Sequence, residues 1–354
     1  MKIVSIVGAR PQFINEYIIS KMVRKICDYV VIHTGQHYDF EMSQIFFDQL
    51  GLLEPDYNLG IGSATHGEQT GKMLIKIESL LIKEKPDVVL VYGDTNSTLA
   101  GALSAVKLNI PVGHVEAGLR SFDKTMPEEV NRILTDHCSS LLFAPTKTAK
   151  ENLIKEGIKK GVYVTGDVMY DALVHNLKIA EKSKILKQLR IKPNQYYLTT
   201  IHRQSNTDDI KNLSNIIEAL SEINEKVIFP VHPRTKKLIK KYNLNKKMKK
   251  NIKNTKPFGY FDFIWLEKNA KKILTDSGGV QKEAYILKIP CITLRENTEW
   301  VETVKDKWNI LVGSDKDKIL DAVYNFQPKQ KQHQYFGEGR ACQNIVKILK
   351  EYIK

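Results

Sequence analysis

Short apolar runs rich in valine and isoleucine alternate along the chain with longer amphipathic segments. Two sets of such runs occur, at residues 3–7, 29–33, 88–92, 112–115, 141–144 and 162–165, and at residues 197–201, 226–231, 272–275, 291–294 and 309–312. Amphipathic segments such as residues 40–50 and 68–84 separate the runs. Continuous apolar strands that alternate with helices predict parallel sheets covered by helices on both faces.

The two sets of runs predict two domains, which agrees with a length of 354 residues. A lysine-rich segment at residues 170–193, which we expect to be helical, separates them. We place the boundary between residues 168 and 169, so that residues 1–168 form the first domain and the second begins at 169.

Nearly every predicted strand is followed by residues suited to chemistry or anion binding. They include Gly8-Ala9-Arg10, Gly93-Asp94 and Glu116-Ala117-Gly118 in the first set, and His202-Arg203, His232-Pro233-Arg234 and Asp276-Ser277-Gly278-Gly279 in the second. In open α/β sheets, ligands bind beyond the carboxyl ends of the strands. We therefore predict an α/β protein in which two doubly wound, Rossmann-like domains face each other across a cleft.

Composition narrows the class of protein further. Hydrophobic residues at 42% and charged residues at 27% are ordinary globular values. No apolar run is long enough for a membrane span, the chain opens directly into a strand, and its four cysteines form no CxxC pair. We expect a cytoplasmic protein without a signal peptide, a disulfide framework or a zinc site. The net charge of +14 owes much to ten lysines in residues 234–256. Tyr242 is the only aromatic residue in this segment that could stack on a base, so the segment favours a solvated face over a nucleic-acid site.

Several familiar cofactor sites are absent. Gly8-Ala9-Arg10-Pro11 stands where a dinucleotide fingerprint would, but lacks the GxGxxG pattern. Residues 62–67 have P-loop spacing, but Glu68 replaces the required lysine. His33 and His37 are four residues apart, yet His33 lies in a predicted strand. We therefore expect no metal and no cofactor.

Asp276-Ser277-Gly278-Gly279 is the strongest local signal for ligand binding. A strand ends, a hydroxyl and two glycines leave the backbone N–H groups accessible, and a helix begins. Such helix N-termini bind phosphate, although a plain tight turn would have the same residues. Glu283, one turn into the helix, is placed to accept hydrogen bonds from ribose hydroxyls.

An acidic constellation consists of Asp94, Glu116 and Glu128. Carboxylates at strand ends that face a cleft are candidates for general acid–base catalysis, whereas Asp94 and Glu128 could also serve as helix caps or dipole partners. Glu116 is flanked by apolar residues, where an uncompensated carboxylate is costly, and is the best functional candidate of the three. His202 would point into the cleft from the second domain, and Arg10 and Arg132 are among the candidate phosphate ligands.

These motifs resemble those of the non-hydrolysing UDP-N-acetylglucosamine 2-epimerases, over essentially the full chain. The matching stretches are Gly8-Ala9-Arg10-Pro11-Gln12, Thr34-Gly35-Gln36-His37, Gly93-Asp94-Thr95-Asn96-Ser97-Thr98, His114-Val115-Glu116-Ala117-Gly118-Leu119-Arg120, Pro127-Glu128-Glu129-Val130-Asn131-Arg132, Thr275-Asp276-Ser277-Gly278-Gly279 and Thr298-Glu299-Trp300. The resemblance implies a GT-B architecture in which a final helix at residues 341–354 crosses back to the first domain, leaving 169–340 as the second.

The resemblance also implies roles for individual residues. The catalytic positions are Asp94, Glu116, Glu128 and His202. The nucleotide-sugar contacts are Arg10, Arg132, His232, Ser277, Gly278, Gly279 and Glu283, with Phe263 stacked on the uracil. The implied enzyme is a homodimer that uses neither metal nor nicotinamide. It epimerises C2 of UDP-GlcNAc to give UDP-ManNAc, by elimination of UDP to a 2-acetamidoglucal and re-addition.

The sequence departs from the family pattern at three places. Asn15 replaces a common lysine, Ser205 replaces a glutamate of the His-Arg-x-Glu-Asn motif, and residues 66–70 lack the arginine of a bacterial allosteric site. Residues 66–71 and 121–127 are more similar to the branch that epimerises UDP-2,3-diacetamido-2,3-dideoxyglucuronate. That substrate and a GT-B glycosyltransferase that uses a UDP-sugar are the alternatives to UDP-GlcNAc epimerisation.

Overall fold

The computed structural model describes residues 2–36 and 54–352, with the backbone alone for Arg10 and Pro11. His37 and the helix expected at residues 40–50 lie outside the described residues. The chain forms two compact units, Met1–His175 with Gln334–Lys354, and Asn176–His333. The division falls within a helix, α7 (Val168–Ala180), close to the expected boundary at residue 168.

The first unit contains a parallel sheet, which in the described residues has seven strands in the order β3-β2-β1-β4-β5-β6-β7. Its strands are β1 (Lys2–Val7), β2 (Asp28–His33), β3 (Tyr57–Asn58), β4 (Val88–Tyr92), β5 (Val112–Val115), β6 (Leu141–Ala144) and β7 (Val162–Val164). The order reverses between β1 and β4, which makes the sheet doubly wound as predicted and creates a crevice beyond the carboxyl ends of these strands.

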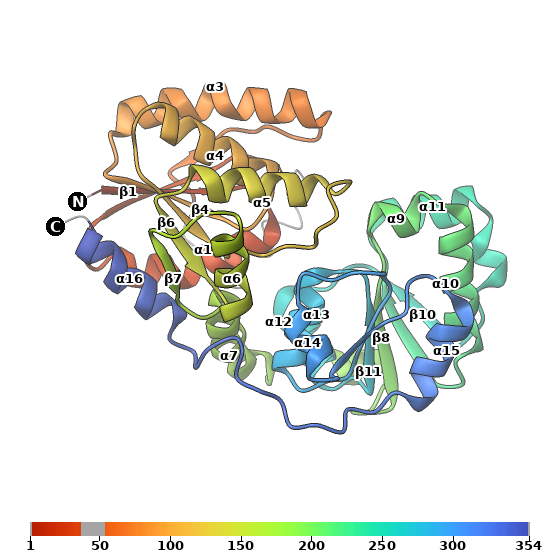
Figure 1. Ribbon diagram of the computed structural model, residues 1–354. Helices are drawn as coiled ribbons and strands as arrows, with labels where there is room; N and C mark the ends of the chain where they lie inside the picture. Colours follow the sequence, from red (N-terminus) through yellow and green to blue (C-terminus); the bar gives the residue numbers. More distant parts are fainter. Residues whose placement is uncertain (1, 37–53, 353–354) are drawn as a thin grey trace. The chain divides into compact units, whose positions relative to one another are not determined.

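Helices cover both faces of this sheet (Figure 1). They are α1 (Arg10–Val23), α3 (His66–Glu84), α4 (Asn96–Lys107), α5 (Pro127–Cys138), α6 (Lys147–Lys155), α7 and α16 (Ala341–Tyr352). Strand β1 is apolar on both sides because helices cover both of its faces. Ile3 and Val7 pack in the cluster that includes α1 and α16, whereas Val4 and Ile6 pack in the cluster that includes α3 and α4. The final helix therefore belongs to the first unit.

A buried carboxyl group on α1 makes the stability of this unit depend on pH. Burial raises the pKa of Glu16 from its ordinary value of 4.5 to about 7, and nearby Arg24 only partly offsets this rise. The folded state therefore holds the proton of Glu16 over a range in which the unfolded chain has lost it. The stability associated with the protonated group is fully present below pH 4.5 and is lost as the pH rises through 7.

Glu16→Gln is therefore expected to become progressively more stable than the wild type between pH 4.5 and 7. The difference should change by about 3 kcal/mol over this interval and remain constant above it. Urea unfolding of both proteins at several pH values measures it. A difference that does not vary with pH would show that Glu16 titrates normally in the folded protein.

The second unit repeats the architecture with a parallel sheet that has six strands, in the order β10-β9-β8-β11-β12-β13, within the described residues. The strands are β8 (Tyr196–Thr200), β9 (Lys226–Pro230), β10 (Ile252–Thr255), β11 (Lys272–Thr275), β12 (Cys291–Thr293) and β13 (Asn309–Leu311). The order reverses between β8 and β11, so a second crevice lies at the carboxyl ends of these two strands.

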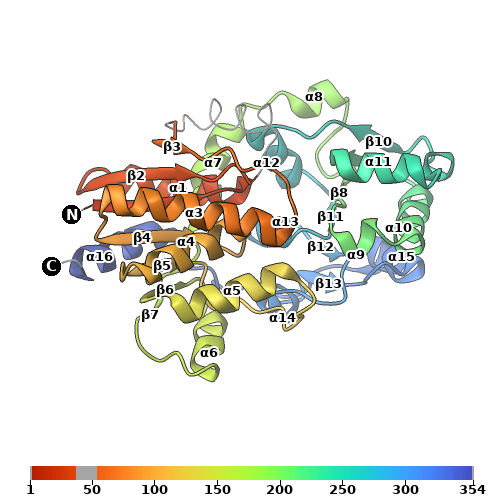
Figure 2. The same ribbon diagram turned by 90° about the horizontal axis from the view of Figure 1, so that it is seen from above.

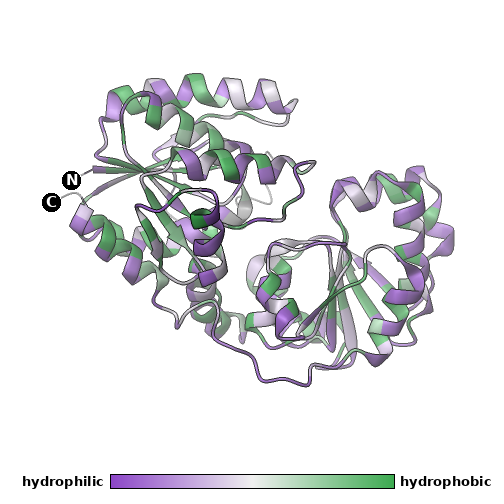
Figure 3. Ribbon diagram, in the orientation of Figure 1, coloured by the Kyte–Doolittle hydropathy of each residue, from purple (hydrophilic) through white to green (hydrophobic). Residues whose placement is uncertain are grey.

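The helices of the second unit again lie on both faces of the sheet (Figure 2). They are α8 (Ile185–Leu189), α9 (Gln204–Thr207), α10 (Ile210–Glu222), α11 (Pro233–Lys241), the 3-10 helix η1 (Leu244–Lys247), α12 (Tyr260–Lys268), α13 (Gly278–Ile286), α14 (Val301–Lys305) and α15 (Lys316–Asn325). Apolar residues concentrate along the strands and the inward helix faces (Figure 3). None of the helices in the described ranges combines the length and apolar character that a membrane span requires.

The lysine-rich stretch at residues 234–256 is more than a solvated face. It forms α11, η1 and the edge strand β10, and its apolar members Ile239, Leu244 and Ile252 are buried in the core of the second unit. The lysines lie between these anchors and are mostly exposed. The sequence reading missed β10 because it has one buried residue and two exposed polar ones, Lys253 and Asn254.

Candidate functional site

Two neighbouring strands of the first unit end in acidic residues. β4 pairs in parallel with β5, with Tyr92 opposite Val115, so Asp94 and Glu116 follow strands that end side by side. A Cβ atom placed on Gly93 would lie 3.4 Å from Oε2 of Glu116, so this carboxylate lies over the turn that precedes Asp94. The structure thus brings together two of the carboxylates identified in the sequence.

Glu116 has an unusual backbone conformation. Its φ of 72° is left-handed, a region that residues with a Cβ atom rarely adopt. The side chain is half-buried, although its neighbours Val115 and Ala117 are fully buried. Strained residues of this kind concentrate at functional sites.

Asp94 and Glu128 do not cap the helices that follow them. Thr95 occupies the N-cap of α4 and accepts a hydrogen bond from the Thr98 backbone N–H, and Met126 occupies the N-cap of α5. Glu128 lies in the first turn of α5 and is half-buried, where the helix dipole favours a carboxylate. Capping therefore explains neither acid, although the dipole contributes at Glu128.

Arg132 is buried and bridges two carboxylates. Its Nη2 donates to Oδ2 of Asp94, and its Nη1 donates to Oε2 of Glu129 over 3.0 Å. Glu129 also accepts from the backbone N–H groups of Ser121, at 2.9 Å, and Phe122, at 2.8 Å. Arg132 is a predicted nucleotide-sugar contact, whereas Glu129, which holds the loop at Ser121 and Phe122, has no role predicted from the sequence.

Gln12 joins two loops that border the crevice at the carboxyl ends of β1 and β4. Its Oε1 accepts from the N–H groups of Gly8, at 2.7 Å, and Ala9, at 2.9 Å, and its Nε2 donates to the Tyr92 carbonyl over 2.6 Å. The loops after β1 and β4 are therefore held together by one buried side chain. The side chain of Arg10, a predicted substrate contact in this loop, lies outside the described residues.

The second unit has its own cluster of polar groups at strand ends. Asp276, which follows β11 and is fully buried, accepts from the His202 N–H with both oxygens, at 3.1 and 3.0 Å. It also accepts from the Arg203 N–H at 3.0 Å and from Nδ2 of Asn206 at 3.1 Å. This carboxylate orders the loop after β8 and leaves the His202 side chain 39% exposed.

Asp276→Asn is expected to lower the free energy of unfolding by about 2 kcal/mol, because an amide N–H₂ would face backbone donors in a site without solvent. Asp315→Asn is the matched control. Asp315 is the exposed N-cap of α15 and accepts from the Lys318 N–H, a role that asparagine fills equally well. Urea unfolding compares the two. Equal losses would contradict the importance of the buried carboxylate.

The remaining predicted residues of the second unit lie near His202 or on adjacent helices. The rings of His202 and His232 are 6.3 Å apart, and His232 caps α11 by accepting from the Arg234 N–H. Ser277 is the N-cap residue of α13, which begins with Gly278 and Gly279. Glu283 is buried on α13, and Phe263 is half-buried on α12, which packs against α13.

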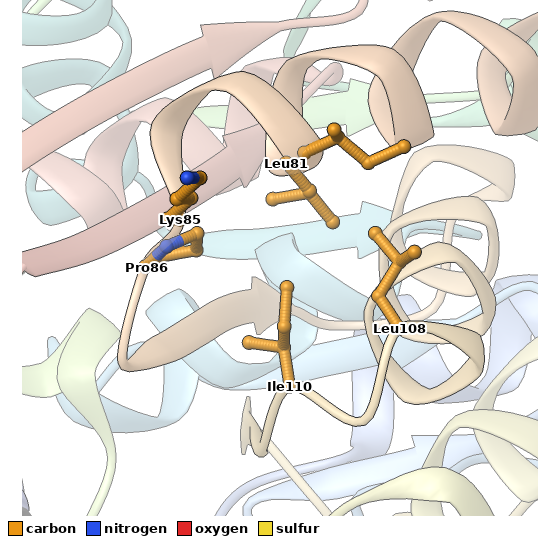
Figure 4. A pocket seen from close by; sticks show the side chains of 6 residues that line it. Leu81, Lys85, Pro86, Leu108 and Ile110 are labelled. Carbon is orange, nitrogen blue, oxygen red and sulfur yellow. The ribbon is translucent and has the colours of Figure 1, made fainter.

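A hollow on the surface of the first unit is separate from these residues. It has a volume of about 310 Å³ and is lined by Leu81, Ile82, Lys85, Pro86, Leu108 and Ile110 (Figure 4). Pro86 precedes β4 and Ile110 precedes β5, so the hollow lies at the amino ends of these strands. The carboxylates lie at the opposite ends.

Each unit thus carries groups suited to one kind of chemistry. The first carries carboxylates at strand ends, suited to proton transfer, with Arg132 to offset their charge. The second carries a glycine-rich helix start and two neighbouring histidines, suited to an anionic ligand. Among residues 2–36 and 54–352, we find no group of three or more His, Cys, Asp or Glu side chains arranged to hold a metal ion.

Comparison with known proteins gives one consistent result. A family model described as UDP-N-acetylglucosamine 2-epimerase matches residues 21–350. A UDP-N-acetylglucosamine 2-epimerase homolog of Methanococcus maripaludis is 61% identical over 99% of both chains. The UDP-2,3-diacetamido-2,3-dideoxy-D-glucuronate 2-epimerase of Pseudomonas aeruginosa is 46% identical, again over 99% of each chain.

A solved structure supports the same conclusion. The crystal structure of the Methanocaldococcus jannaschii UDP-GlcNAc 2-epimerase, in complex with UDP-GlcNAc and UDP, has a TM-score of 0.94 to this chain. It is 53% identical, and the match covers 99% of this chain and 100% of that one. The resemblance expected from the motifs is confirmed, as is the GT-B-like α/β fold with two parallel sheets. This chain belongs to the UDP-N-acetylglucosamine 2-epimerase family.

Proposed function

We propose that this protein interconverts UDP-GlcNAc and UDP-ManNAc by removing and re-adding UDP. The observation that carries the proposal is the pair of strand-end carboxylates, Asp94 and Glu116, in a chain that matches the family over nearly its whole length. In the forward direction a base takes the C2 proton, and the C–H electrons form the C1=C2 bond as the C1–O bond to UDP breaks. In re-addition, a UDP oxygen attacks C1 of the 2-acetamidoglucal and a proton reaches the opposite face of C2.

The carboxylates of the first unit suit the proton-transfer steps. The C2 hydrogen is weakly acidic, so its removal needs a positioned base and a stabilised leaving group. Delivery of a proton to either face requires two acid–base groups, which fits a site with several carboxylates. We assign this work to Asp94, Glu116 and Glu128, together with His202 of the second unit.

The second unit suits the leaving diphosphate. A helix that begins with Gly278 and Gly279 has no Cβ atoms of its own over its first N–H groups; the Glu299 carboxylate lies against Gly278, whereas the space beside Gly279 is open apart from Ser277. We assign these residues, with Ser277 and His232, to the diphosphate, and Glu283 and Phe263 to the nucleoside. Arg10 and Arg132 complete the proposed contacts.

The comparisons support UDP-GlcNAc over the diacetamido uronate as substrate. The UDP-GlcNAc 2-epimerase of Methanocaldococcus jannaschii is 53% identical to this chain, against 46% for the Pseudomonas aeruginosa enzyme that acts on the uronate. The latter match still spans 99% of the chain, so the uronate is the second candidate substrate. The two substrates undergo the same reaction at C2 and are distinguished by experiment.

Proton NMR in D₂O tests the proposal. Incubation of the protein with UDP-GlcNAc alone should produce the anomeric signal of UDP-ManNAc with deuterium at C2. Turnover of the diacetamido uronate, with UDP-GlcNAc unchanged, would establish the second substrate instead. A reaction that proceeds only when a sugar acceptor is added would identify a glycosyltransferase and contradict the epimerase assignment.

A further inference from the structure

A buried histidine and aspartate lie behind the strand ends that carry the proposed catalytic carboxylates. His114 lies in β5 two residues before Glu116, Asp136 lies on α5, and both side chains are 0% exposed. Nδ1 of His114 is 2.7 Å from Oδ1 of Asp136. Nε2 of the same ring is 2.7 Å from the carbonyl oxygen of Gly93.

Both ring nitrogens of His114 face groups that only accept hydrogen bonds. The Gly93 carbonyl cannot donate, and an ionised carboxylate cannot donate either, so each ring nitrogen must carry a hydrogen to form its bond. Asp136 is ionised because Oδ2 accepts from Nη1 of Arg120, at 2.7 Å, and from the Gly118 N–H, at 3.1 Å. Burial by itself raises the pKa of Asp136, but its positively charged neighbours hold that pKa below the usual value.

The surrounding charges balance when His114 is a cation. Arg120 also makes a two-bond pair with Glu156, with distances of 2.7 and 2.6 Å. His114 and Arg120 then supply two positive charges, and Asp136 and Glu156 supply two negative ones. Glu156 is 28% exposed and also lies 3.6 Å from Nε2 of His137, so the buried part of this network is His114, Arg120 and Asp136. A neutral imidazole there would direct a ring lone pair at an acceptor, which is costly in a buried site.

We propose that His114 is held as an imidazolium and acts with Asp136 as a positioning pair for the epimerisation, fixing the Gly93 and Gly118 turns around Glu116. These turns have left-handed φ angles of 61° and 82°. His114 binds the carbonyl of one turn and Asp136 binds the N–H of the other. The kinetic part of this inference rests on the proposed function, whereas the protonation state and the geometry do not.

Nitrogen-15 NMR of the full-length protein, labelled at its nine histidines, tests the protonation state without substrate. At pH 8, one histidine should retain protons on both ring nitrogens, with slow exchange, and its signals should be absent from His114→Gln. Asp136, Arg120 and Glu156 are the charged groups that maintain this state. A wild-type spectrum in which every histidine has a single ring proton overturns the imidazolium.

Two substitutions at His114 separate the two hydrogen bonds. Glutamine places a donor where Nε2 lies and retains the bond to Gly93, whereas asparagine places one where Nδ1 lies and retains the bond to Asp136. Each variant should lower kcat by about 100-fold, the effect of a small displacement of catalytic groups, and leave KM nearly unchanged. The exposed His175 provides the control His175→Gln, for which we expect wild-type kinetics.

The outcomes distinguish this inference from the proposed function. Wild-type kcat in both His114 variants, or a change in KM alone, overturns the positioning role. Failure of the wild type to epimerise any UDP-sugar contradicts the proposed function only. In that case backbone amide signals decide the positioning role: that of Gly118 shifts in His114→Gln, which loses the bond to Asp136, and that of Gly93 shifts in His114→Asn, which loses the bond to the Gly93 carbonyl. Unchanged signals in both variants overturn it. If neither variant folds, the wild-type ring spectrum still tests whether His114 is an imidazolium.

Discussion

Replacing Glu116 with glutamine is expected to lower kcat for the interconversion of UDP-GlcNAc and UDP-ManNAc by about 1,000-fold, within the range that general acid–base groups contribute. Glutamine has the shape of glutamate but cannot take up the C2 proton at neutral pH. Substrate binding should remain within about threefold of the wild type, because the diphosphate contacts assigned to the second unit are unchanged. Initial rates measure kcat, and isothermal titration with UDP measures binding through those diphosphate contacts.

The unusual backbone of Glu116 makes this substitution informative. Glutamine pays the same conformational penalty at a φ of 72° as glutamate does, so thermal stability should change little and lost activity cannot be attributed to unfolding. Glu151→Gln, on the exposed surface of α6, controls for the removal of a negative charge. Wild-type rates in Glu116→Gln would show that the base is another residue.

Much of the fold could be predicted because buried parallel strands leave a local signal. The apolar runs at residues 88–92, 112–115, 141–144 and 272–275 coincide with β4, β5, β6 and β11. These strands are buried on both faces, so most of their positions are apolar, although β5 contains His114 and β11 begins with Lys272 and ends with Thr275. The short edge strands β3 (Tyr57–Asn58) and β10 lack this constraint and were missed.

The candidate site was predictable to the extent that its residues directly follow strands. Asp94 and Glu116 were identified because consecutive strands placed them at one edge of a sheet. Their supporting residues were not, because each acts on a partner distant in the sequence: Gln12 binds the carbonyl of Tyr92, 80 residues away, and Asp136 binds His114, 22 residues away. A histidine inside an apolar strand gives no local sign of such a partner.

Gly118→Ala is expected to lower the free energy of unfolding by about 3–5 kcal/mol, whereas Gly157→Ala should cost about 1 kcal/mol. Both glycines have left-handed φ angles, of 82° and 87°, so both substitutions introduce similar backbone strain. They differ in what the new methyl group would meet. At Gly118 it would lie 2.8 Å from the carbonyl carbon of Ala149 and still closer to the oxygen, whereas at Gly157 nothing in the described part of the chain lies within 4 Å.

The Gly118 turn cannot move aside to relieve this overlap. Its N–H is held by Asp136 at 3.1 Å, and its carbonyl accepts from Nδ2 of Asn152 at 3.0 Å. Displacement of the turn would break these buried hydrogen bonds and shift Glu116, two residues earlier, so Gly118→Ala should lose activity as well as stability. Urea unfolding of both variants, with activity measured on the folded fraction, tests this account. Equal losses of stability would mean that the turn relaxes freely, and that the hydrogen bonds on its two sides do not hold Glu116 in place.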